Sequence, residues 1–202
     1  MDALEADASS AAGPSGFHRL VAHAIVSSEG RIAAADGTMP PCLIVPADQR
    51  RFQGELSAAA LTVLGREGHE RHPVARPRLV LTSRVAALER DGTAWLWNPA
   101  GASLADALAR GAPEGGTVVV AGGGRTMALM LPRLDALDLA VAETCAIPGG
   151  RPCVEGAESL HALRERIAGA GLVGTDMPWL DEARRVRLWR YERAQSARAP
   201  VA

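Results

Sequence analysis

The feature that most constrains this chain is the stretch GGTVVVAGGGRTMALML at residues 115–131, in which three glycines follow an apolar run. The β-branched residues 117–120 predict a buried central strand. Gly122, Gly123 and Gly124 predict a tight turn, and the residues after them predict a helix that ends before a proline. Strand, glycine turn and helix bring bare backbone to a ligand at the carboxyl end of a sheet. A tight turn without a ligand is the alternative, since the spacing matches neither a dinucleotide fingerprint nor a phosphate P-loop.

The chain on either side of this stretch alternates between predicted strands and predicted helices. A loop at residues 27–46 separates the first strand from the first helix, and loops of this length in a compact domain are usually functional. Ser103 is the expected N-cap of the second helix. The alternation predicts an α/β fold with a mostly parallel sheet. Strands are expected at 18–26, 60–64, 78–82, 94–97, 137–143 and, as an antiparallel edge strand, 186–191; helices are expected at 48–59, 103–109 and 158–168.

Composition limits the classes of protein to which the chain can belong. Its 202 residues fit one domain, expected at 17–193 between disordered tails at 1–16 and 194–202. The formal net charge of −1 gives no basic field for nucleic acid, and no run of about 18 apolar residues predicts a membrane span. All 22 basic side chains are arginine, so lysine Schiff-base chemistry is excluded.

Cysteine and histidine spacing gives no sign of a metal site. Cys42, Cys145 and Cys153 form no C-x-x-C pair, so we expect three plain thiols in a reducing cytoplasm. His69 and His72 lack the spacing of a zinc motif, and no metal is expected. A histidine within the first strand, His23, is more typical of the core than of catalysis.

Taken in order, these segments resemble dihydrofolate reductase and the related reductase domain of riboflavin biosynthesis. The resemblance covers about residues 18–155 and rests on four motifs. It implies a dihydrofolate reductase-like three-layer α/β sandwich with a mostly parallel central sheet and an antiparallel C-terminal edge. The motifs are AIVSSEGRIAAADGTMPP at 24–41, PADQRRF at 46–52, LTVLGRE at 61–67 with RPRLVLTSR at 76–84, and VVVAGGGRTMALMLPRLDALDLA at 118–140.

The resemblance implies hydride transfer from NADPH to an imine carbon of a pterin or pyrimidine. Asp48 is the implied catalytic residue, because a carboxylate there accepts hydrogen bonds from a 2-amino-4-oxo edge and organises the water that protonates the ring nitrogen. Met39, Phe52 and Arg76 are the implied substrate contacts. The local sequence alone favours a helix-capping role for Asp48, and the motifs around it favour the catalytic role. A core position is the alternative for Phe52 and is compatible with a substrate contact.

The resemblance also implies which residues hold the cofactor. Arginine is suited to reading a 2′-phosphate through paired charged hydrogen bonds, and strand-end hydroxyls add donors. The glycine turn would hold the pyrophosphate on backbone N–H groups. Taken singly, either arginine is equally consistent with a solvated surface charge. The implied cofactor-binding residues are Gly65, Arg66, Thr82, Ser83, Gly122, Gly123, Gly124, Arg125 and Thr126.

Three departures from the family pattern leave the substrate open. Pro41, Met127 and Ala140 stand where the family usually has Trp, Tyr and Thr. The main hypothesis is an NADPH-dependent reductase of dihydrofolate or its analogue dihydromethanopterin. The alternatives are a pyrimidine reductase of the riboflavin-biosynthesis type and a non-catalytic nucleotide-binding member. A cytoplasmic protein is expected, with a homodimer as one option for its assembly.

Overall fold

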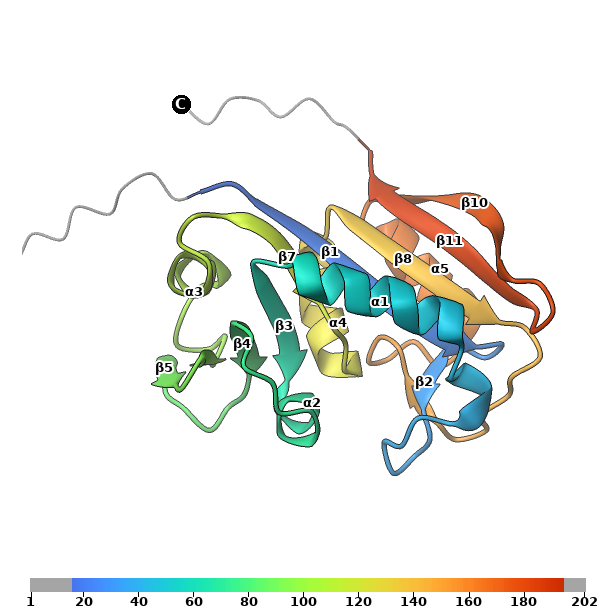
Figure 1. Cartoon of the computed structure of the whole chain (residues 1–202), viewed down its shortest axis with the longest axis horizontal. Helices are drawn as coiled ribbons and strands as arrows, with labels where there is room; N and C mark the ends of the chain where they lie inside the picture. Colours follow the sequence, from blue (N-terminus) through green and yellow to red (C-terminus); the bar gives the residue numbers. More distant parts are fainter. Residues whose placement is uncertain (1–15, 195–202) are drawn as a thin grey trace, which may run out of the picture.

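The computed structural model describes residues 16–194 and is built on one nine-stranded sheet (Figure 1). Strand β1 (His18–Ser27) lies at its centre and pairs in parallel with β7 (Gly116–Val120) and β8 (Ala136–Ala142). All seven residues of β8 are buried, as expected for a strand covered on both faces. The order across the sheet is β10-β11-β8-β1-β7-β3-β4-β6-β5.

Parallel pairing continues on one side of this centre, and antiparallel pairing closes both ends. The parallel strands are β3 (Leu61–Gly65), β4 (Arg78–Leu81) and β6 (Ala94–Trp97). The antiparallel strands are β5 (Leu88–Asp91), β10 (Leu172–Asp181) and β11 (Val186–Arg193). The mostly parallel sheet with an antiparallel C-terminal edge is therefore confirmed.

Helices cover both faces of the sheet and make three layers. Helix α1 (Pro46–Ala58) packs Phe52 and Leu56 against one face. On the other face, a single apolar cluster joins the sheet to three helices through Leu108, Met127, Leu163 and their neighbours. These helices are α3 (Leu104–Gly111), α4 (Gly124–Met130) and α5 (Leu160–Gly169).

Several elements escaped prediction because they are short or polar. Within the predicted 27–46 loop lie β2 (Arg31–Ala33), which pairs with β9 (Arg151–Pro152), and the 3-10 turn η1 (Pro41–Leu43). Helix α2 (Arg66–Arg71) and strands β5 and β10 were also missed, so β11 is second from the edge. Ser103 caps α3 as predicted, because its side chain accepts a hydrogen bond from Asp106 N. The predicted tails fall almost wholly outside the described residues.

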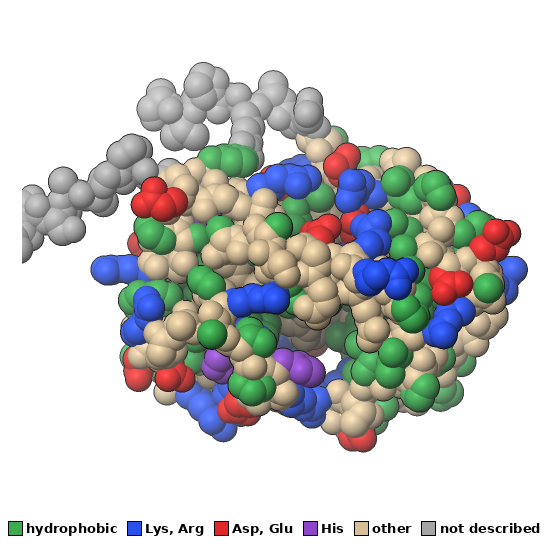
Figure 2. Space-filling view, viewed as in Figure 1, with side chains coloured by type: hydrophobic (Ala, Val, Ile, Leu, Met, Phe, Trp, Pro, Cys, Tyr) green, Lys and Arg blue, Asp and Glu red, His purple; other side chains and the backbone are tan. Residues whose placement is uncertain are grey.

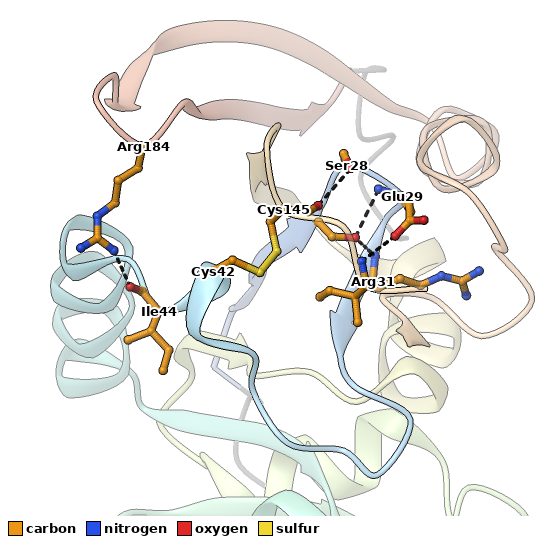
Figure 3. Close-up of a disulfide and its surroundings, with 9 residues drawn as sticks. Ser28, Glu29, Arg31, Cys42, Ile44, Cys145 and Arg184 are labelled. Carbon is orange, nitrogen blue, oxygen red and sulfur yellow. Dashed lines mark hydrogen bonds between the residues drawn. A yellow bond between two sulfur atoms is a disulfide. The ribbon is translucent and has the colours of Figure 1, made fainter. Parts of the chain in front are cut away.

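The prediction of three plain thiols is wrong. Cys42 in η1 and Cys145 after β8 form a disulfide with a Cα–Cα distance of 5.6 Å (Figure 3). The carbonyl of Cys145 also accepts hydrogen bonds from Ser28 N and Ser28 Oγ, at 2.9 and 3.0 Å. Only Cys153 is free among the described cysteines, and burial raises the pKa of its thiol to about 12. The inference of a reducing compartment rested on free thiols and loses that support.

The disulfide fixes the segment that leads into α1. Cys42 lies four residues before the helix begins, and the guanidinium of Arg184 donates to Ile44 O at 2.9 Å from the β10–β11 turn (Figure 3). The start of α1 is thereby tied to two distant parts of the chain. Among the described residues, no helix is long and apolar enough to cross a membrane.

We predict that Cys42→Ser lowers the free energy of unfolding by about 3 kcal/mol, because the bond links residues 103 positions apart and restricts the unfolded chain. Denaturant titration with and without a thiol reductant measures the effect. The reductant should destabilise the parent chain and leave the variant unchanged. Equal stability of the parent with and without reductant would contradict the prediction.

Candidate active site

The topology has a switch point between β1 and β7, the position at which α/β sheets form a ligand crevice. These two strands are parallel neighbours, but the chain leaves β1 toward α1 on one face and leaves β7 toward α4 on the other. Ligands of α/β sheets bind where adjacent strands send their connections to opposite faces. The last paired residues, Ala22 and Val120, place His23 level with the end of β7, where the glycine turn begins.

Asp48 lies in the first turn of α1 and faces this crevice region from above β1. Its carboxylate accepts a hydrogen bond from His23 Nε2 at 3.0 Å, and solvent reaches only 7 % and 2 % of the two side chains. The helix N-cap is Val45 and has no side-chain cap. Asp48 therefore orients toward the sheet rather than capping its helix. Its second oxygen, Oδ2, has no hydrogen-bond partner within residues 16–194.

A buried charge cluster continues from His23 toward the surface. Asp138, the neighbour of His23 on β8, accepts two hydrogen bonds of 2.8 Å from Arg190 and a third from Arg51. Burial raises the pKa of Asp138, but the hydrogen bonds and charge of Arg190, with the charges of Arg51 and His23, outweigh it and leave this pKa below the ordinary value. Asp138 is thus a stable anion beside the His23 ring.

This cluster resembles a metal site in composition but not in charge. One ligand atom each of His23, Glu55 and Asp138 lie within 4.8 Å of one another. Two guanidinium groups, those of Arg51 and Arg190, already occupy the carboxylate of Asp138. A divalent cation would meet these positive charges at close range, so the arrangement favours an internal ion pair over metal binding.

Phe52 has the core role considered from the sequence, and its contact with the substrate stays a prediction. Its ring centroid lies 5.4 Å from that of His23, with the planes tilted by 36°. The same side chain packs with Val21, Val119 and Ala136 against the sheet. Phe52 therefore belongs to the core and also borders the Asp48–His23 pair.

The glycine turn leaves its backbone bare. Gly122 and Gly123 have φ of +103° and +89°, which favours glycine, and a Cβ on Gly122 would meet no atom within 4 Å. A Cβ on Gly65 would lie 3.4 Å from Thr126 Oγ1, so the end of β3 adjoins the turn. Two predicted cofactor segments thus come together. Gly124 instead faces Pro152 O, because a Cβ there would lie at 2.9 Å, whereas Arg125 points into solvent.

Two of the residues predicted to bind the 2′-phosphate, Arg66 and Thr82, line a groove of about 390 Å³ beside β4 and α2. Arg66 donates to both oxygens of Glu70 at 2.7 Å, and Arg84 lies 3.7 Å from the same carboxylate. These hydrogen bonds from Arg66 hold the pKa of Glu70 below its usual range. Thr82 is buried in the groove and accepts from Arg84 N, whereas Ser83 is exposed beside it.

The segment after β2 is hydrogen-bonded to α2 and β9 beside a hollow in the surface. Arg71 of α2 donates to Gly37 O at 2.7 Å, and Arg151 of β9 joins Ala35 O to the carboxylate of Glu67. Figure 2 shows the hollow between α2 and the region of β2, with histidine side chains on one side. Met39, on this segment, is 51 % exposed.

Arg76 lies before β4 and is half-buried. Its charge helps lower the pKa of Arg78, although burial of Arg78 is the larger cause. No hydrogen bond or ion pair of Arg76 is found within residues 16–194. Its predicted contact with the substrate stays a prediction.

Sequence reasoning missed the polar partner of Asp48 and the charged cluster beside it. His23 was assigned to the core, and Asp138, Arg51 and Arg190 were not singled out. The available signal was a polar side chain between apolar residues in the middle of β1 and of β8, at paired positions. Arg84 and Glu70 were missed beside Arg66 because both lie on exposed, charged segments.

Comparison with known proteins identifies the fold. No protein-family model and no curated protein sequence matches the chain. A dihydrofolate reductase from Enterococcus faecalis complexed with NADP(H) and RAB-propyl is 22 % identical, with a TM-score of 0.59 over 88 % of this chain and 98 % of that one. The protein therefore has the architecture of a three-layer α/β sandwich. Within that architecture, its fold is the dihydrofolate reductase fold.

Two structures from riboflavin biosynthesis share this fold. A putative riboflavin biosynthesis protein from Shewanella sp. PV-4 is 16 % identical, with a TM-score of 0.59 over 87 % of this chain and 99 % of that one. A diaminohydroxyphosphoribosylaminopyrimidine deaminase/5-amino-6-(5-phosphoribosylamino)uracil reductase from Thermotoga maritima is 11 % identical, with a TM-score of 0.61 over 88 % of this chain and 57 % of that one. Similarity at these sequence identities establishes the fold. The reaction has to be inferred from the residues of the site.

We predict that Gly122→Ala weakens NADPH binding at least tenfold, because its methyl group would project into the space above the turn. Gly92→Ala is the matched control: Gly92 also has positive φ and open space around a Cβ, but it lies in the β5–β6 turn. Both variants should lose about 1 kcal/mol of stability through backbone strain. Fluorescence titration with NADPH measures the binding, and equal affinities of the two variants would contradict a cofactor at the turn.

Proposed function

We propose that this protein is an NADPH-dependent reductase that transfers a hydride to a C=N bond of a dihydropterin, with dihydrofolate and dihydromethanopterin as candidate substrates. The proposal makes it an oxidoreductase with a small-molecule substrate. The observation that carries it is Asp48: a nearly buried carboxylate with one oxygen held by His23 and the other unpartnered, at the crevice beside the glycine turn.

Asp48 suits the chemistry of a pterin ring. An ionised carboxylate only accepts hydrogen bonds, and the 2-amino-4-oxo edge of a pterin offers neighbouring N–H donors. The same carboxylate can orient a water molecule that delivers the proton to the ring nitrogen. NADPH supplies the hydride when bound. Phe52, tilted against His23, offers an aromatic surface beside the same carboxylate.

The groove at α2 supports a preference for NADPH over NADH. Arg66 and Arg84 approach one another around the carboxylate of Glu70, which is an anion held by two guanidinium groups. A 2′-phosphate presents the same kind of acceptor to the same donors with more charge. Because half of the Glu70 side chain is exposed, it can give way to the phosphate. The NADP(H) in the Enterococcus faecalis structure is in line with this choice.

A pyrimidine reductase of the riboflavin-biosynthesis type is the second candidate. The similar structures include a putative riboflavin biosynthesis protein and a deaminase/reductase of phosphoribosylated pyrimidines. His23 on β1 and the charged cluster beside it also lie under α1 near Asp48, and such polar groups suit the hydroxyl groups of a ribosylaminopyrimidinone. Measuring NADPH oxidation against dihydropterins and ribosylaminopyrimidinones separates the two. No oxidation with any of them would contradict both.

We predict that Asp48→Asn lowers turnover roughly 100-fold or more, the range of general acid–base contributions. The residual rate should rise as the pH is lowered, because solvent then protonates the ring nitrogen directly. NADPH affinity should change little. Asp106→Asn is the control, since Asp106 also lies in the first turn of a helix, α3, but bonds Ser103. Unchanged turnover of Asp48→Asn with a lower melting temperature would contradict the catalytic role.

We predict that Arg66→Ala raises the KM for NADPH by roughly 30-fold, equivalent to about 2 kcal/mol for charged hydrogen bonds to a phosphate. The KM for NADH should stay nearly constant, because NADH has no phosphate at this position. NADH kinetics on the same variant are therefore the internal control. Equal losses for both cofactors would remove Arg66 from phosphate recognition.

A further inference from the structure

We infer that His23 is the positioning residue for Asp48. The inference deepens the proposed function and rests on it. It assigns the buried pair of Asp48 on α1 and His23 on β1 to the orientation of the carboxylate at the substrate.

The hydrogen bond fixes which oxygen of Asp48 meets the ligand. Because an ionised carboxylate only accepts, the proton lies on His23 Nε2 and points at Asp48 Oδ1. With Oδ1 held at 3.0 Å, the carboxyl group cannot rotate freely, and Oδ2 is directed away from the histidine. A carboxylate fixed before the substrate arrives loses less entropy on binding it.

The other ring nitrogen of His23 is buried. Its Nδ1 is buried without a hydrogen-bond partner within residues 16–194. Ligand atoms of Asp138 and Glu55 lie within 4.8 Å of one on His23, but neither carboxylate forms a hydrogen bond with the ring within residues 16–194. The ring is therefore held by its hydrogen bond to Asp48 and by the neighbouring ring of Phe52.

The charges around His23 come from one helix and two strands. Helix α1 contributes both acidic and basic groups, while β8 and β11 contribute one each. The hydrogen bonds and charge of Arg190 keep the pKa of Asp138 below its ordinary value, so this neighbour of His23 is an anion. The groups are Asp48, Arg51 and Glu55 of α1, Asp138 of β8 and Arg190 of β11.

Two substitutions at His23 separate positioning from packing. His23→Leu fills the space but offers no donor, so kcat should fall roughly 10- to 100-fold, the scale of a misplaced catalytic group. The KM for NADPH should stay within about threefold. His23→Gln restores an N–H donor and should recover most of kcat. His18→Gln is the matched control, because His18 lies on the same strand and bonds only the backbone carbonyl of Ala112.

Equal losses of kcat in His23→Leu and His23→Gln, or no loss in either, would overturn the inference. A lower melting temperature of His23→Leu with unchanged kcat would also overturn the inference. A second readout needs no substrate: nuclear magnetic resonance of the ¹⁵N-histidine-labelled chain should show a hydrogen-bonded Nε2 proton that Asp48→Ala abolishes and His18→Gln preserves. If the parent chain does not oxidise NADPH with any of the tested substrates, the proposed function fails. Independently of that result, persistence of the Nε2 proton signal in Asp48→Ala would overturn the Asp48–His23 pair.

Discussion

The parallel pairing of β1 with β7 is the constraint on which the rest of the structure depends. Once these two apolar strands lie side by side, their connections must leave toward different faces for both faces of the sheet to be covered. Helix α1 then covers one face and brings Asp48 over β1. The glycine turn after β7 opens on the same crevice. The proposed catalytic residue and the proposed cofactor-binding turn therefore lie at the same switch point of the sheet.

Burying charge beside this crevice is costly unless every charged group has a partner. Asp138 meets the condition with three hydrogen bonds from two arginines, and Asp48 meets it through His23. An apolar interface of the same shape would be as stable or more so. The Asp48–His23 hydrogen bond is therefore better explained by the proposed orientation of the carboxylate than by a contribution to stability.

Local signals in the sequence were sufficient for the centre of the fold. The apolar runs of β1 and β7, the three glycines and the Ser103 cap each act within a few residues, and each was predicted. Strand β10 was missed because its sequence is polar and contains a proline. It is a strand because β11 pairs with it. Short, charged α2 likewise owes its place to the strands around it.

Contacts between segments far apart in the chain could not be predicted from the sequence. Cys42 and Cys145 lie 103 residues apart, and only the path of the loop into α1 brings them together. The pairing of His23 with Asp48 depends on which face of α1 meets β1, which no local pattern specifies. Asp48 itself was found because its motif resembles that of a known family, whereas the partners that hold it became visible only in the folded chain.

Hydride transfer is the central claim, and isotope labelling tests it most directly. The chain is incubated with NADPH carrying deuterium at C4 of the nicotinamide, in each C4 configuration, together with each dihydropterin and pyrimidinone, and the products are weighed by mass spectrometry. The account predicts that one substrate class gains a single deuterium from one of the two cofactors. Deuterium that stays on the nicotinamide with every substrate, in a folded protein that binds NADPH, would contradict it.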